Sequence, residues 1–316
     1  MKFGLVLSII GVLIALCQPK ITFAGAVSGL NIWFFQLLPS LLPFMILSNI
    51  LLSDACQNYL FGNRNLDSMR RIRLVFTIAT GFTFGLPIGA KITKDMYQKG
   101  WINQKDGQYL LNHCNLIGPS FVGSYVLSTK LNLPEYFLMT VCILYLPHLV
   151  CILLHFWKKQ PDTQAKHNVY IPDNTFTTRT TRKATPRLRN CFQILNVAIM
   201  NGFETITILG GYLILFGIFC SFIKELSVIP LELRAILLSC MEITTGIHEI
   251  ASLSLAPAIK YVCAVPLLSF GGLCSVLQTQ SVIAGCPFSM RRYIKVRILF
   301  SLLCFFLCLG TFFILC

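Results

Sequence analysis

The residues best suited to chemistry are ionisable side chains inside segments that are apolar enough to enter a bilayer. Glu242 follows the run "ILLSCM", Glu204 lies in "NGFETITIL", and Lys91 ends "TGFTFGLPIGAK". Ionisable groups at membrane depth are costly and are usually functional. Glu242 can carry a coupling proton, bind a cation, or pair with a lysine such as Lys91 or Lys260. Lys91 can reach the membrane interface as a structural lysine or supply the positive charge for an anionic ligand.

Glycine and proline interrupt these apolar segments. Within "TGFTFGLPIGAK" they break a helix and can shape the tip of a turn. The backbone amides at a helix start carry partial positive charge and bind anions. Small and polar residues also interrupt the runs "NLIGPS" and "SFGGLCSVLQTQS". The predicted substrate-binding residues are Gly85, Pro87, Gly89, Lys91, Asn115, Gly118, Pro119, Ser120, Glu242, Thr244, Thr245, Gly246, Ser269, Gly271, Gly272, Ser275 and Gln278.

No arrangement of residues in the sequence predicts an enzyme. There is no Ser/His/Asp constellation and no nucleotide-binding loop. His113 and Cys114 are adjacent, so on a helix they project about 100° apart. The 14 cysteines lie mostly in apolar segments, without CxxC pairs or metal-ligand spacing to the five histidines. Free cysteine packs as a small hydrophobe, so the cysteines are not expected to bind a metal. Together with the missing catalytic motifs, this pattern leads us to expect no catalytic site, no metal and no cofactor.

The composition is that of a polytopic membrane protein. Hydrophobic residues make up 55% of the 316 residues, charged residues make up 12%, and the mean hydropathy is +0.71. The run from Tyr136 to Trp157 supplies the roughly 20 apolar residues that a helix needs to cross a bilayer. The net charge of +14 would suggest nucleic acid in a soluble protein, but cytoplasmic loops of membrane proteins collect Lys and Arg. The lipid bilayer is therefore an expected partner, and nucleic acid is not.

Charge predicts which side of the membrane each loop faces. The loop 224–234 is balanced and should be external. Residues 73 and 91 both belong to basic stretches, so both should be cytoplasmic. The segment between them therefore cannot be a single crossing and must enter and return as a re-entrant hairpin. The same parity argument requires one of the two apolar stretches 235–255 and 259–283 to be re-entrant from outside. Gly246, Pro257 and several polar residues favour "CMEITTGIHEIASLSLAP" as this hairpin. We predict seven crossings, a cytoplasmic N-terminus and an external C-terminus. The basic stretches that should be cytoplasmic are 53–73, 91–106, 158–190 and 291–297.

The two halves of the chain show the same order of elements in opposite orientation. Each reads as a crossing, a hairpin and two further crossings, the first of which is broken. Inverted repeats with broken helices at corresponding positions are typical of secondary transporters. The first 26 residues resemble a signal peptide, but their long apolar core favours an uncleaved helix. The predicted domains are an N-terminal helix (1–29), a first repeat (30–157), a basic cytoplasmic linker (158–190) and a second repeat (191–316).

Five segments carry a resemblance to a known family. They are "LLPSLLPFMILSNILL" (37–52), "GLPIGAK" (85–91), "NHCNLIGPSF" (112–121), "MEITTGI" (241–247) and "LLSFGGLCSVLQTQ" (267–280). In this order they resemble the sporulation integral membrane proteins of the YlbJ (SpoVV) family, which carry nucleoside-recognition Gate domains. The resemblance covers nearly the whole chain outside the linker. It implies a fold similar to concentrative nucleoside transporters. It also implies a role in endospore-forming Firmicutes, in moving dipicolinate from the mother cell across the outer forespore membrane.

The residues and the resemblance together predict a secondary transporter of a small anionic metabolite, with dipicolinate as the best candidate. Lys91 and the helix-end amides are expected to bind the substrate carboxylates. Glu242 is expected to be protonated or paired when substrate is bound, since a bare carboxylate would repel it. The alternatives are a transporter of nucleosides or other small solutes and a non-transporting membrane assembly factor. The sequence leaves open a coupling proton or cation and a homo-oligomer.

Overall fold

The computed structural model describes residues 15–51, 53, 55–56, 66–157 and 191–315. Every regular element within these ranges is a helix, so the predicted all-α class is confirmed for them. The predicted linker 158–190 lies outside the described residues. The elements are α2 (Pro19–Asn31), η1 (Ile32–Leu37), α3 (Leu38–Leu51), α5 (Leu66–Phe84), α6 (Ile88–Gln98), α7 (Gln104–Cys114), η2 (Phe121–Leu131), η3 (Pro134–Tyr136), α8 (Phe137–Trp157), α9 (Cys191–Lys224), α10 (Leu231–Met241), α11 (Ile243–Ser252), α12 (Pro257–Phe270), α13 (Gly272–Val282) and α14 (Met290–Leu315).

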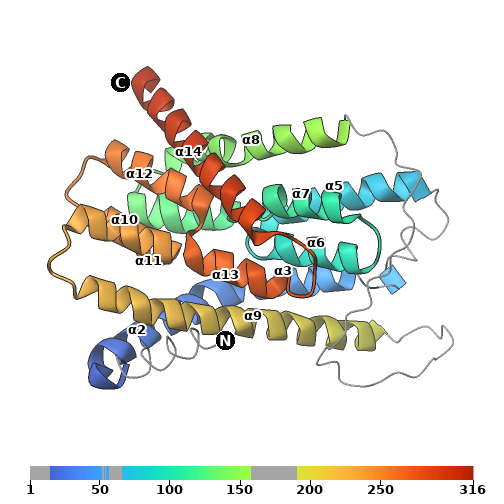
Figure 1. Cartoon of the computed structure of the whole chain (residues 1–316), viewed down its shortest axis with the longest axis horizontal. Helices are drawn as coiled ribbons and strands as arrows, with labels where there is room; N and C mark the ends of the chain where they lie inside the picture. Colours follow the sequence, from blue (N-terminus) through green and yellow to red (C-terminus); the bar gives the residue numbers. More distant parts are fainter. Residues whose placement is uncertain (1–14, 52, 54, 57–65, 158–190, 316) are drawn as a thin grey trace.

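The first helical stretch packs along the longest helix. α2, η1 and α3 follow one another directly, with a bend of 55° between the two arms of the stretch. α2 and α3 both pack against α9, which has 34 residues and lies along one edge of the molecule (Figure 1). The indole N–H of Trp33 in η1 donates to the Ile206 carbonyl of α9 at 2.8 Å. The predicted domain boundary between residues 29 and 30 falls inside this continuous stretch.

The helices α5 and α6 form a hairpin, and its turn contacts the break after α7. Gly85 in this turn has φ +75°, a left-handed conformation that other residues seldom adopt. A Cβ on Gly85 would also overlap the backbone of Gly118. α7 ends at Cys114, residues 115–118 are not helical, and a helix resumes at residue 119 and continues as the π-type helix η2 from Phe121. The predicted interruption at "NLIGPS" is therefore a real gap between two helices, and it lies directly against the hairpin turn.

The helices α10 and α11 form a second hairpin, which contacts the break between α12 and α13. Glu242 alone separates α10 from α11, and its backbone is extended. Gly271 alone separates α12 from α13, which begins at Gly272, and these two glycines have φ values of +84° and +80°. A Cβ on Gly272 would lie 3.2 Å from the carbonyl oxygens of Ser239 and Met241. The second broken helix is thus packed against the second hairpin turn, as the first is against the first.

The helices present an apolar surface that suits a bilayer. Four helical spans in the described ranges are long and apolar enough to cross a membrane, with α12 and α13 counted together as one of them. The number is five if the bent stretch α2–α3 counts as one span. Large apolar side chains such as Phe203, Phe219 and Phe306 are exposed on α9 and α14. These features support the predicted polytopic membrane protein. The number of crossings and the side that each loop faces stay predictions.

Candidate functional site

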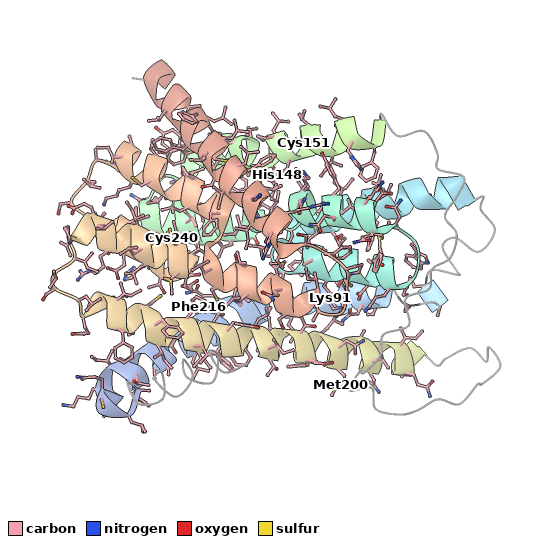
Figure 2. All side chains as sticks on the ribbon, viewed as in Figure 1. Lys91, His148, Cys151, Met200, Phe216 and Cys240 are labelled. Atoms are coloured by element: carbon pink, nitrogen blue, oxygen red, sulfur yellow. The ribbon has the colours of Figure 1, made fainter. Side chains whose placement is uncertain are left out.

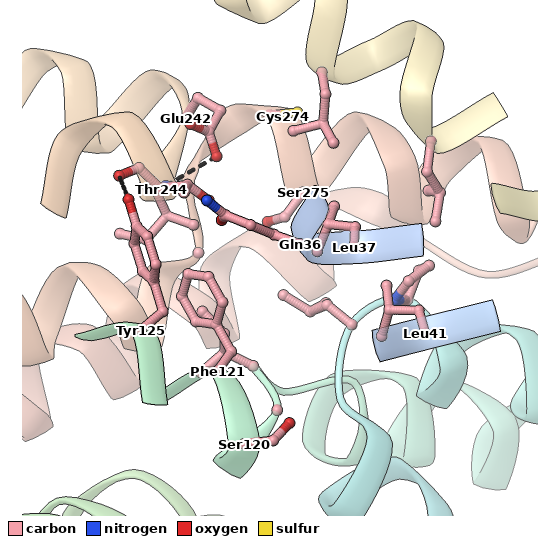
Figure 3. Close-up of a pocket in the computed structure, with 18 of the residues that line it drawn as sticks. Gln36, Leu37, Leu41, Ser120, Phe121, Tyr125, Glu242, Thr244, Cys274 and Ser275 are labelled. Atoms are coloured by element: carbon pink, nitrogen blue, oxygen red, sulfur yellow. Dashed lines mark hydrogen bonds between the residues drawn. The ribbon is translucent and has the colours of Figure 1, made fainter. Parts of the chain in front are cut away.

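A cavity of about 450 Å³ lies where both hairpin turns and both helix breaks meet. Leu86 and Pro87 come from the first turn, Gly118 and Ser120 from the first break, and Gly271 from the second. Figure 3 shows Gln36, Phe121 and Tyr125 pointing into the same space as Glu242 and Thr244. The remaining lining residues are Leu37, Leu41, Phe84, Ile117, Ser124, Thr129, Lys130, Leu209, Leu213, Ile243, Cys274, Ser275 and Gln278. The predicted convergence of the four interrupted segments is therefore observed.

Glu242 is the acidic group of this cavity, and it caps α11. Its side chain is 3% exposed. The Thr244 N–H donates to Glu242 Oε1 at 2.9 Å, and the Thr245 N–H donates to Oε2 at 2.7 Å. These amides belong to the first turn of α11, where backbone N–H groups have no partner within the helix. The partial positive charge of the helix start also favours the carboxylate. Glu242 therefore occupies the anion-binding position that the sequence suggests for a substrate.

Tyr125 connects η2 of the first half of the chain to α11 of the second. Its hydroxyl donates to the Thr244 carbonyl at 3.1 Å, and its ring stacks on Phe121 with centroids 5.0 Å apart. Lys130 lies in the last turn of η2, and its amine is 5.3 Å from the Tyr125 ring centroid. The Lys130 amine also lies 3.1 Å from His248 Nδ1, which must act as the acceptor because the ammonium can only donate. An aromatic wall thus runs from Glu242 toward a cation.

Side chains of α13 form the opposite part of the lining. The Ser275 hydroxyl donates to the Gly272 carbonyl at 2.9 Å. The Gln278 amide donates to Cys274 Sγ at 3.3 Å, and sulfur is a weak acceptor. Gln278 is 7% exposed, whereas Gln280 on the same helix is exposed and does not line the cavity. The amide of Gln278 is therefore the polar group of α13 best placed to meet a solute.

Asn115 does not line the cavity, and its side chain instead forms hydrogen bonds that connect helices. It is fully buried, and its Oδ1 accepts from the Ala90 N–H at 3.1 Å. Its Nδ2 donates to the Thr279 hydroxyl at 2.9 Å and to the Tyr293 hydroxyl at 3.0 Å. The Ala90 N–H is one of the first four of α6, which lack a partner within the helix. Asn115 thus joins the first hairpin to α13 and α14.

Lys91 lies on α6 and does not line the cavity. Its amine donates to Asn49 Oδ1 at 2.5 Å and forms an ion pair with Asp95 at 3.1 Å, one helical turn away. The Lys91 side chain is 13% exposed. Figure 2 labels it beside α3 on the side of the molecule away from α10. The expected role of Lys91 as the cation for a substrate in this cavity is therefore not supported by its position.

Arg297 of α14 is a buried cation that contacts the end of α12. It was not selected in the sequence analysis. It is 1% exposed, and its Nη1 donates to the Ser269 carbonyl at 3.0 Å. Its Nε and Nη2 donate to the Tyr293 hydroxyl at 3.1 and 3.0 Å. The Ser269 carbonyl is among the last four of α12, where the negative end of the helix dipole favours a cation. Arg297 therefore stabilises the second helix break.

The structure divides the predicted binding residues into two groups. Sequence reasoning missed Gln36, Tyr125 and Lys130, although an amide within "WFFQLLP" and a lysine after "FVGSYVLST" are unusual in apolar runs. Glu204 on α9 is exposed and lies outside the cavity. The predicted residues that line the cavity are Pro87, Gly118, Ser120, Glu242, Thr244, Gly271, Ser275 and Gln278. Those that do not are Gly85, Gly89, Lys91, Asn115, Pro119, Thr245, Gly246, Ser269 and Gly272.

The described residues contain no group of three or more His, Cys, Asp or Glu side chains that could hold a metal ion.

Among curated proteins, the chain is similar to the sporulation integral membrane protein YlbJ of Bacillus subtilis (strain 168). The two are 24% identical, and the match covers 89% of this chain and 75% of that protein. No family model and no solved structure matches the chain. The match confirms the resemblance carried by the five sequence segments.

Proposed function

We propose that this chain, a member of the YlbJ family of sporulation membrane proteins, is a secondary transporter of a small anionic solute. Dipicolinate, moved from the mother cell across the outer forespore membrane, is the best candidate. The observation that supports transport most directly is the convergence of two hairpin turns and two helix breaks on one cavity. Interrupted helices within apolar layers are tolerated where they are buried in protein or line a cavity, and they form the solute sites of many transporters.

The arrangement of the hairpins supports two inverted repeats. α5–α6 is followed by α7, a break and η2, whereas α10–α11 is followed by α12, a break and α13. Figure 1 shows α10 and α11 at one end of the long axis and α6 and α7 toward the other end. If the long axis lies along the membrane normal, the two hairpins are re-entrant from opposite sides. A solute in the cavity would then be reached from either face by movement of one hairpin against the other.

The lining suits a flat, partly apolar anion. Phe84, Phe121 and Tyr125 offer aromatic surfaces for a planar ring, and Lys130 supplies a positive charge to the lining. The charge of Glu242 in the same lining opposes a dicarboxylate in a low-dielectric cavity. A dianion therefore requires Glu242 to bind a proton, or the solute to enter with a proton or cation. This requirement is a physical reason to expect coupled transport.

The two alternatives make different demands on the same residues. A nucleoside carries no charge, so its uptake would not depend on Lys130 and would depend chiefly on hydrogen-bonding groups such as Gln278 and Ser120. An assembly factor would have no need of a polar cavity, so its function would survive substitution of the lining. The cavity residues thus distinguish all three readings in one assay.

The test uses the full chain in proteoliposomes that exchange labelled dipicolinate, with unlabelled uridine as competitor. Gln278→Met keeps the side-chain length but removes the amide, and we expect exchange to fall about ten-fold, the effect of one hydrogen bond of about 1.4 kcal/mol. Gln280→Met, on the exposed side of α13, is the matched control and should exchange like the parent. Competition by uridine would favour the nucleoside reading, and no exchange of either solute by the parent would overturn transport.

A further inference from the structure

Two buried histidines face each other where α7, α8 and α14 pack together, outside the cavity lining. His113 Nδ1 lies 3.0 Å from His148 Nδ1. His113 is 5% exposed and His148 is 1% exposed. Figure 2 shows His148 where α14 crosses α8. Neither residue has a place in the solute site described above, so their direct contact calls for a separate explanation.

The contact between the two Nδ1 atoms constrains where protons can be. Each neutral imidazole carries one N–H, so one ring must donate from Nδ1 and the other must accept at Nδ1. His148 Nε2 is buried and has no hydrogen-bond partner among the described residues. If His148 donates to His113, that Nε2 is a bare lone pair that can take a proton. If His113 donates instead, His113 Nε2 takes it. In both cases one added proton strengthens the contact into a charge-assisted hydrogen bond.

A second added proton would have the opposite effect. Both Nδ1 atoms would then be donors, the hydrogen bond would be lost, and the two cationic rings would repel each other. The contact between α7 and α8 therefore tolerates at most one added proton on the pair. Phe300 of α14 stacks on His148 with ring centroids 3.8 Å apart, and the face of an aromatic ring favours a neighbouring cation.

Ionisable groups surround the pair on all three helices. Tyr109 and Cys114 lie on α7, and Cys151 and His155 lie on α8. Arg297 of α14 acts electrostatically on both histidines. Because the Arg297 charge is fixed, a proton on the pair is repelled by it in this conformation and would be held better if α14 moved away. Proton occupancy and the position of α14 are thus linked, which is the basis of coupling between two states.

A line of polar rings leads from the pair toward the end of α8 that is predicted to be cytoplasmic. Tyr109 contacts the His113 ring at 4.4 Å, and it stacks on His155 with centroids 3.9 Å apart. His155 Nε2 lies 3.4 Å from Asp106 Oδ1, and the His155 side chain is 28% exposed. The Tyr109 hydroxyl donates to the Cys151 carbonyl at 2.8 Å. A proton that approaches from solvent through His155 would therefore reach His113 only after this hydroxyl rotates away and a water bridges the gap.

The pair is also connected to the elements that enclose the cavity. Phe300, which contacts both histidines, lies on α14 close to Arg297. Arg297 binds Tyr293, and Tyr293 accepts from Asn115, which holds the start of α6. A change in the position of α14 would thus be felt at the first hairpin and at the α12–α13 break.

We propose that the His113–His148 pair is a proton-binding site that couples proton movement to solute transport. The proposal rests on the transport function proposed above and adds the coupling ion and its site. One proton enters past Asp106 and His155, binds to the pair, and leaves when α14 returns to the position described here. Proton and solute move through separate parts of the protein, and α14 links them.

The test separates exchange from accumulation in proteoliposomes containing the full chain. With one proton coupled to each solute, and with the membrane potential clamped at zero by potassium and valinomycin because each cycle moves net charge, a pH difference of one unit should drive about ten-fold accumulation of dipicolinate by the parent. The double variant His113→Gln/His148→Gln retains hydrogen-bonding side chains but has no imidazole to carry the proton. We expect this variant to exchange solute while the ratio of accumulation to exchange falls to the value measured without a gradient. Each single variant keeps one imidazole and should lose only part of the ratio. His248→Gln, on an exposed histidine remote from the pair, is the control and should keep the parent ratio.

Each outcome bears on a different claim. Gln variants that accumulate solute like the parent, or a parent that exchanges solute but ignores the gradient, would overturn the coupling site and leave the transport function standing. A parent without any exchange would overturn both. If the double variant does not fold, nitrogen NMR of histidine-labelled parent decides the matter. The proposal requires two of the five histidines to share a proton that is gained or lost when dipicolinate binds, which a purely structural pair does not require. Histidine signals that do not change on dipicolinate binding would refute it.

Discussion

Replacing Asn115 with leucine tests whether this residue holds the fold together or binds solute. Leucine has the same branched outline but cannot form hydrogen bonds. The substitution leaves the Ala90 N–H buried without a partner, which costs about 1–3 kcal/mol. It also removes two hydrogen bonds to the hydroxyls of Thr279 and Tyr293. Thr279 still donates to Ser275, and Tyr293 still binds Arg297, so each loss costs only about 0.5–1.5 kcal/mol. We expect the free energy of unfolding to fall by about 2–6 kcal/mol in total.

The measurement is reversible unfolding in mixed micelles, together with solute exchange by the fraction that remains folded. Asn115→Leu should lower stability while the affinity of the folded protein for solute stays at the parent value. Gln278→Met is the matched comparison, because it faces the cavity and should reduce exchange with little loss of stability. The reasoning would be refuted if Asn115→Leu left the unfolding free energy unchanged and weakened solute binding instead.

Three further predictions follow from the positions of single residues and loops. Lys91→Met should leave solute exchange unchanged and lower stability by less than about 1 kcal/mol, since the amine is held by neighbours outside the cavity; loss of exchange in proteoliposomes would contradict this. Glu242→Gln should cost about 1–2 kcal/mol of stability, because a glutamine can accept only one of the two amide hydrogen bonds, and it should raise the affinity for anions in a binding assay. Reporter fusions after residues 160 and 224 should report opposite sides of the membrane, and the same side for both would refute the inverted arrangement.

The helix breaks were predictable because their causes are local. Glycine, proline and asparagine within apolar runs mark where a helix must end, and Gly85 and Gly271 adopt the left-handed conformations that such residues permit. The convergence of the breaks followed from the mirrored order of the segments. Loop sidedness came from charge, which the described residues do not test.

The partners of individual polar side chains were not predictable. Asn115 is separated from Thr279 by 164 positions in the chain, so no sequence pattern indicates that they meet. Lys91 was expected in the cavity because it follows the turn, but one helical turn directs its amine to Asp95. Lys130 was missed because a lysine at a helix end is usually interfacial. Tertiary packing decides each of these cases.

Breaking helices inside an apolar layer creates helix ends, and this chain supplies its own groups to satisfy them. Asn115 accepts from the start of α6, Glu242 caps α11, and Arg297 binds the end of α12. A carboxylate of the solute can therefore use the amides of α11 only if Glu242 leaves them. Protonation of Glu242 would weaken its hold on those amides and remove its repulsion of an anion at the same time. The group that stabilises the empty cavity is thus the one that an anionic solute must displace, so solute entry and the state of Glu242 cannot be independent.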